Sequence, residues 1–97
     1  MDTTYGSLVE YQNELTVLLS KHTTVQVNVY IDNKNKVFLI RPFCNSNYVH
    51  IIYEDIYSIF KQGGLHIPYT GCFEPIEISF KDAANFLTVL KLKNINK

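Results

Sequence analysis

Arginine is nearly absent from this sequence, since Arg41 is the only one. The nine basic side chains equal the nine acidic ones in number. Because the charges balance, the sequence lacks the excess of positive charge that nucleic-acid-binding proteins usually carry. Long apolar runs are absent too, because no stretch approaches the roughly 18 to 20 apolar residues that cross a bilayer. The first residues also lack a basic segment followed by an apolar run. We therefore expect a soluble, cytoplasmic protein with no membrane partner.

Cysteine is scarce, with only Cys44 and Cys72 in the chain. They can pair in principle, but two cysteines without a secretion signal are more often reduced thiols. Phosphate-binding glycine loops are missing, because Gly63 and Gly64 follow a predicted helix instead of preceding one. No histidine pair flanks a glutamate in metalloprotease order, and no acidic cluster has calcium-loop spacing. We expect no cofactor, no metal and no catalytic residues.

Apolar residues make up 46% of the chain and charged residues 19%, a composition that favours a folded domain over a disordered one. At 97 residues, one hydrophobic core is the economical arrangement, so residues 1–97 are expected to form a single compact domain. Such a small domain gains stability from pairing with a second copy, and a net charge near zero gives little repulsion against it. A homodimer is therefore expected.

Two helices are predicted from capping-box spacing, in which two side chains satisfy backbone donors at a helix start. Ser7 and Glu10 have that spacing, and leucines then recur at helical intervals to about Lys21. Ser79 and Asp82 repeat the spacing before a final helix that ends near residue 90. Residues 91–97 are expected to form a frayed C-terminal tail.

The middle of the chain alternates between strand and helix patterns. From Thr24 the apolar period becomes two, which predicts a strand to Ile31, a polar turn, and a second strand from Val37 to Ile40. Pro42 either ends that strand or places it at an edge. Residues 48–52 resemble a third strand that runs into a helix ending at Gly63 and Gly64, with Asp55 in its first turn. Residues 65–69 and 72–80 are predicted as short strands, and Pro68 and Pro75 limit how far either can pair in a sheet.

The predicted fold class is therefore α+β. A small antiparallel or mixed sheet of three to five strands is packed by three helices, in the order α-β-β-β-α-(β-β)-α.

Two arrangements of chemically reactive side chains stay open. Cys44, His50, His66 and Cys72 have the ligand types of a tetrahedral zinc shell, although structural zinc sites usually use close pairs. Cys72, His66 and Glu74 form the only local set with a thiol, a base and a carboxylate. The spacing does not decide whether either set converges. A small cysteine enzyme or a Cys2His2 zinc domain is therefore kept as an alternative.

Aromatic residues are abundant, with seven tyrosines and six phenylalanines in a chain too small to bury them all. Tyr30 falls on the polar face of the first predicted strand, and Tyr57 falls off the apolar stripe of the second predicted helix. Exposed tyrosine marks protein interfaces, because a rigid ring supplies contact area at low entropic cost. The predicted partner-binding residues are Tyr30, Tyr57, Tyr48, Tyr53, Tyr69 and Arg41.

These observations favour a non-enzymatic protein-binding or regulatory module that acts through an aromatic surface. The excess of lysine, asparagine and isoleucine is typical of AT-rich genomes, and suggests an accessory protein of a phage, virus or plasmid that inhibits a host factor. One alternative is a single-stranded nucleic-acid-binding protein in which Tyr48, Tyr53 and Tyr69 stack on bases. The other is the cysteine enzyme or zinc domain.

Overall fold

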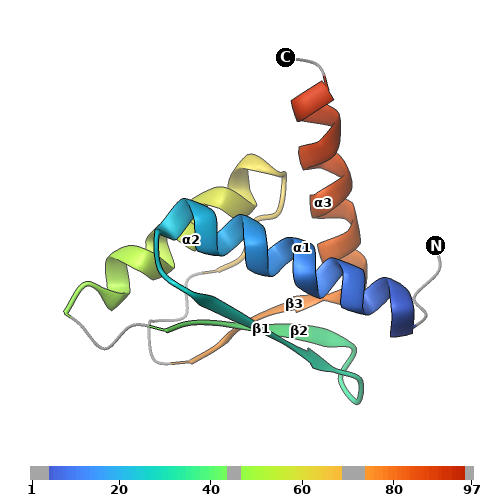
Figure 1. Ribbon diagram of the computed structural model, residues 1–97, viewed down its shortest axis with the longest axis horizontal. Coiled ribbons are helices and arrows are strands. Elements are labelled where there is room, and N and C mark those ends of the chain that lie inside the picture. Colours follow the sequence, from blue (N-terminus) through green and yellow to red (C-terminus); the bar gives the residue numbers. More distant parts are fainter. Residues whose placement is uncertain (1–4, 44–46, 69–73, 96–97) are drawn as a thin grey trace.

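The computed structural model describes residues 5–43, 47–68 and 74–95 (Figure 1). The elements are α1 (Tyr5–Thr23), β1 (Val27–Asp32), β2 (Val37–Pro42), α2 (Val49–Gln62), β3 (Ile76–Ser79) and α3 (Phe80–Ile95). The three strands form one antiparallel sheet in the order β1-β2-β3, so that β2 is central. The predicted small α+β fold, with three helices and an antiparallel sheet, is confirmed.

All three helices lie on the same side of the sheet (Figure 1). The strand side chains that point toward them are buried, and they are Val27, Val29, Phe38, Ile40, Ile76 and Ile78. The helices contribute the other layer of the core, mainly Leu15 and Leu19 from α1, Ile56 and Phe60 from α2, and Phe86 from α3. Each such side chain stabilises the fold by about 1.5–3 kcal/mol when fully buried. No helix among the described residues covers the opposite face of the sheet.

α1 also closes the outer edge of β1, which would otherwise leave backbone groups unpaired. Gln12 Nε2 donates to the carbonyl oxygen of Val29 at 2.6 Å, and the backbone N–H of Val27 donates to Ser20 Oγ at 2.9 Å. Polar side chains of α1 thus take the place of a neighbouring strand. β1 is consequently a poor template for edge-to-edge pairing, and its accessible part is the face turned away from the helices.

The turn between β1 and β2 is organised by Asp32. Asn35 Nδ2 donates to Asp32 Oδ2 at 2.9 Å, and the backbone N–H groups of Asn35 and Lys34 donate to Oδ1 at 3.2 and 3.1 Å. Lys36 then takes a left-handed backbone conformation, with φ of 56°, before β2 begins. The turn fixes the register in which Asp32 pairs with Val37, and therefore decides which side chains reach the uncovered face.

The hydrogen bonds from Asn35, first from its side chain and then from its backbone, lower the pKa of Asp32 below its ordinary value, with smaller help from Lys34. Because the folded-state pKa is lowered, the stabilisation is present above the unfolded-state value of about 3.9 and is lost as the pH falls through the folded-state value. We expect Asn35→Ala to raise the pKa of Asp32 toward its ordinary value. An NMR titration of the carboxyl carbon measures this, with Asn33→Ala as the control, and an unchanged pKa in Asn35→Ala would contradict the assignment.

The third predicted strand, over residues 48–52, is wrong. Tyr48 is the N-cap of α2, and Val49 begins the helix. Val49, Ile52, Tyr53 and Ile56 follow helical spacing and face the core. A short apolar run fits a strand and a buried helix equally well, and here the helical packing against the sheet decides. Asp55 consequently lies well inside α2, and its predicted place in the first turn is also wrong.

Other boundaries also differ from the prediction. α1 begins at Tyr5, so Ser7 lies inside the helix instead of capping it. α3 continues to Ile95, past the expected start of the tail at residue 91. The cap at Ser79 is confirmed, because the N–H of Asp82 donates to Ser79 Oγ at 3.0 Å.

The region between α2 and α3 contains less sheet than predicted. Leu65–Pro68 is not a strand, and Ile76–Ser79 is the only strand among the described residues of the predicted strand over 72–80. No helix of the described residues is long and apolar enough to span a membrane.

Candidate functional site

The uncovered side of the sheet, which we call the open face, presents nine side chains at alternating positions. They are Asn28, Tyr30 and Asp32 from β1, Val37, Leu39 and Arg41 from β2, Phe43 just after β2, and Glu77 and Ser79 from β3. One face of an antiparallel sheet commonly meets water and is then polar. This one instead combines two exposed aromatic rings with aliphatic side chains and isolated charges.

The middle row of the open face runs across all three strands. Tyr30 pairs with Leu39, and Leu39 pairs with Glu77, so the three side chains lie side by side. Tyr30 is 52% exposed, although Val29 before it is buried, and Leu39 is half-buried beside it. Strand neighbours of this kind have Cβ atoms about 4.5–5.5 Å apart. An aromatic ring and a leucine therefore form a continuous apolar strip that ends at a carboxylate.

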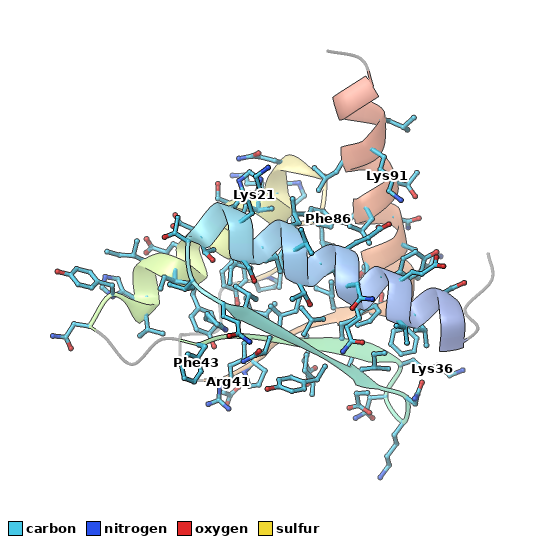
Figure 2. All side chains as sticks on the ribbon, in the orientation of Figure 1. Lys21, Lys36, Arg41, Phe43, Phe86 and Lys91 are labelled. Atoms are coloured by element: carbon cyan, nitrogen blue, oxygen red, sulfur yellow. The ribbon has the colours of Figure 1, made fainter. Side chains whose placement is uncertain are left out.

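Arg41 and Phe43 extend the open face along β2. Figure 2 shows both side chains on the side of the sheet away from the helices. Phe43 is 67% exposed, and its N–H donates to the carbonyl oxygen of Gln26 at 2.7 Å, which continues the ladder by one residue beyond Pro42. Among the described residues neither Arg41 nor Glu77 takes part in an ion pair. Both charges are available to a partner.

A groove of about 470 Å³ adjoins the open face along the outer side of β3. Leu39 and Glu77 belong to both surfaces, and the far wall of the groove is formed by Tyr57, Ile67 and Pro68. Tyr57 was predicted to be a surface aromatic, and it is half-buried in this wall. The open face therefore ends in an apolar hollow that also contains a predicted binding residue.

The other predicted partner-binding residues are not brought together. Tyr53 is only 2% exposed, and its hydroxyl donates to the carbonyl oxygen of Glu74 at 3.1 Å, so its prediction as a surface residue is wrong. It falls on the core side of α2 because it follows Ile52 and precedes Ile56 on the buried stripe. Tyr48 is 66% exposed at the N-cap of α2, outside the open face. Tyr69 lies outside the described residues.

The reactive side chains do not form a group in the described part of the chain. His50 is in the first turn of α2, whereas His66 follows the end of the helix and lines a hollow with Ser58 and Lys61. No three histidine, cysteine, aspartate or glutamate side chains among the described residues are placed to hold a metal ion. Cys44 and Cys72 lie outside those residues, so the zinc shell and the set of Cys72, His66 and Glu74 stay predictions.

Leu39, Glu77 and Phe43 are residues of the open face that the predicted binding set did not include. The signal was the period of two, since Val37, Leu39, Arg41 and Phe43 alternate with the buried Phe38, Ile40 and Pro42. The alternation was followed only to Ile40, because proline was expected to end the strand. Pro42 does end β2, but the chain keeps its direction for one more residue.

Comparison with known protein families, curated proteins and solved structures found no match for this chain.

Proposed function

We propose that the protein is a non-enzymatic protein-binding module that acts through the open face. The observation that carries the proposal is the pair of exposed rings, Tyr30 and Phe43, beside Leu39 on a rigid sheet. Aromatic side chains held on a rigid element lose little entropy when they are buried by a partner. The occupant that best fits the chemistry of the face is a second copy of the same chain.

The charges of Arg41 and Glu77 support this occupant because they are self-complementary. Arg41 lies two residues from Leu39 along β2, and Glu77 lies beside Leu39 on β3. A twofold axis in the plane between two stacked sheets can place each Arg41 against Glu77 of the second copy. With standard strand spacings, that axis passes close to Leu39, so the two leucines face each other. The two sheets then cross at a steep angle, as in orthogonal sheet packing.

The same arrangement provides a place for Phe43. The twofold operation carries its ring across β3 of the second copy to the outer side of that strand. There the groove offers the apolar wall formed by Tyr57, Ile67 and Pro68. In an isologous interface the same surface of both copies is in contact, so one surface must carry both the protruding ring and the hollow that receives it.

The size of the open face limits the strength of the dimer. Three strands about 4.8 Å apart and about 20 Å long offer only about 300 Å² of flat surface. Even with Phe43 and the groove included, the total buried area falls below about 1,200 Å², the range of weak and transient interfaces. We therefore expect reversible association with a dissociation constant in the micromolar range. An inhibitory accessory role in a phage, virus or plasmid is compatible with such a module, and rests on composition alone.

Sedimentation equilibrium from about 10 µM to about 1 mM tests the proposal. The protein should shift from monomer to dimer, and Tyr30→Ala and Phe43→Ala should each weaken the dimer about tenfold, since a central interface ring contributes more than about 1 kcal/mol. Tyr48→Ala is the matched control, because Tyr48 is equally exposed but outside the open face. Circular dichroism confirms that each variant is folded. A chain that stays monomeric throughout, or three variants that behave alike, would refute the proposal.

A further inference from the structure

A second apolar groove lies on the helical side of the molecule, away from the open face. It has a volume of about 800 Å³ and runs between α1 and α3, where the C-terminal half of α3 stands away from the sheet (Figure 1). Its floor is formed by Val17, Leu18, Leu87 and Leu90. Val17 is 67% exposed, although valine in the middle of a helix is normally turned toward a core. The floor is therefore an apolar surface without a cover among the described residues.

The rim of this groove is predominantly basic. Lys21 and His22 in the last turn of α1 stand on one side, and Lys91 of α3 stands on the other (Figure 2). Glu14, the one carboxylate of the rim, accepts a hydrogen bond at Oε1 from Lys91 Nζ at 3.0 Å, so these two charges compensate each other, while its Oε2 is buried without a hydrogen-bond partner among the described residues. This pair joins α1 to α3 and leaves the positive charge of Lys21 uncompensated. A ligand with an apolar stripe and negative flanks is complementary to such a groove.

The helices of a second copy do not meet that description. The exposed side of α2 carries Glu54 and Asp55, but Ile51 is its only exposed large apolar residue. Leu92 is the large apolar residue exposed on α3, and the charges beside it are lysines, which would face Lys21. Val17 is the large apolar residue exposed on α1, and the charges beside it are of both signs, Glu14 and Lys21. Among the described residues, no helix of this chain therefore combines several exposed apolar side chains with flanks that are acidic only.

We propose that the groove between α1 and α3 binds an amphipathic helix of a different protein, with apolar side chains at helical spacing and carboxylates beside them. A third helix laid between two others packs at an interaxial distance of about 8–10 Å and covers the apolar floor. Its carboxylates then lie beside Lys21, the rim charge that no residue of the groove compensates. The groove and the open face are on opposite sides of the sheet, so the two binding events are independent.

Fluorescence anisotropy with designed peptides tests this proposal. The probe is a labelled 18-residue helix with leucines at i, i+3, i+4 and i+7 and glutamates at the flanks, compared with a version that has lysines in place of the glutamates and with a scrambled version. The acidic helix should bind about fivefold more tightly than the basic one, which corresponds to about 1 kcal/mol from exposed charge pairs. The scrambled peptide should not bind.

Variants of the protein identify the groove as the site. Val17→Glu should weaken the acidic peptide about tenfold, and Lys21→Glu should reverse the preference between the acidic and basic peptides. Both residues are exposed, so the variants should fold, and Lys81→Glu is the matched control that leaves peptide binding unchanged, because Lys81 is exposed on α3 but does not line the groove. The proposal is overturned by an acidic peptide that does not bind below about 1 mM, by equal affinity for both charged peptides, or by a dimer that Val17→Glu disrupts. Binding of dodecanoate in place of the peptide would also overturn it, by assigning the groove to a small amphiphile.

Discussion

Replacing Phe38 by alanine should lower the free energy of unfolding by about 3–5 kcal/mol, the usual cost of removing a buried aromatic ring. Phe38 is at the centre of the sheet on β2, is fully buried, and meets the ring of Phe80 edge-on at a centroid distance of 5.1 Å. A domain of this size has only about 5–15 kcal/mol of stability in total. Urea unfolding followed by circular dichroism measures the loss.

Leu39→Ala is the matched control for this prediction, because Leu39 is the next residue on the same strand and points to the open face. At a concentration where the chain is monomeric, its loss should cost about 1 kcal/mol, since only part of the side chain is buried. The difference between the two losses in the free energy of unfolding shows how much more one face of the sheet is covered than the other. Equal losses would mean that something also covers the open face.

Gly63→Ala should destabilise the protein by about 1–3 kcal/mol, the usual cost of overpacking a core. Gly63 ends α2 with φ of −89°, which any residue adopts, so its backbone conformation does not require glycine. Space requires it instead, because a Cβ atom at this position would overlap the ring of Phe86. That ring is buried and packs edge-on against Phe60 at a centroid distance of 5.0 Å, so it has little freedom to move.

Two further variants separate the steric cause of destabilisation from the backbone cause at the end of α2. Gly64→Ala meets no neighbouring atom, but its φ of 83° is left-handed, so its cost should be limited to the backbone penalty of about 1–2 kcal/mol. Phe86→Leu in the Gly63→Ala background should recover part of the loss, and the double-mutant cycle gives the coupling. A Gly63→Ala variant as stable as the wild-type protein, or a cycle without coupling, would contradict the close contact.

Sequence patterns predicted those elements that residues close together in the sequence determine. The alternating valines before Asp32 gave β1, and the hydroxyl of Ser79 gave the start of α3. The prediction that Gly63 and Gly64 end the second helix is also confirmed. The separate roles of the two glycines were not predictable, because the role of Gly63 depends on Phe86, which is distant in sequence.

The patterns failed where tertiary packing decides. Tyr53 occupies a position that suits either a strand or a helix, and only the packing of α2 onto the sheet shows that its ring is buried. Val17 shows the same limit, because it is exposed where the groove between α1 and α3 opens, and no pattern within α1 alone indicates this. Tyr30 was assigned to the face of its strand opposite the valines, and it lies exposed on that face, although its neighbours there are partly apolar.

A charge exchange between Arg41 and Glu77 tests the central claim, that the open face binds a second copy, most directly. Arg41→Glu alone places two carboxylates together at each contact, and Glu77→Arg alone places two guanidinium groups together, so each variant should remain monomeric at concentrations where the wild-type protein dimerises. An equimolar mixture of the two variants restores both opposite-charge contacts. Sedimentation of the mixture should therefore show a heterodimer. A mixture that stays monomeric while the wild-type protein dimerises, or single variants that dimerise as well as the wild type, would contradict the account.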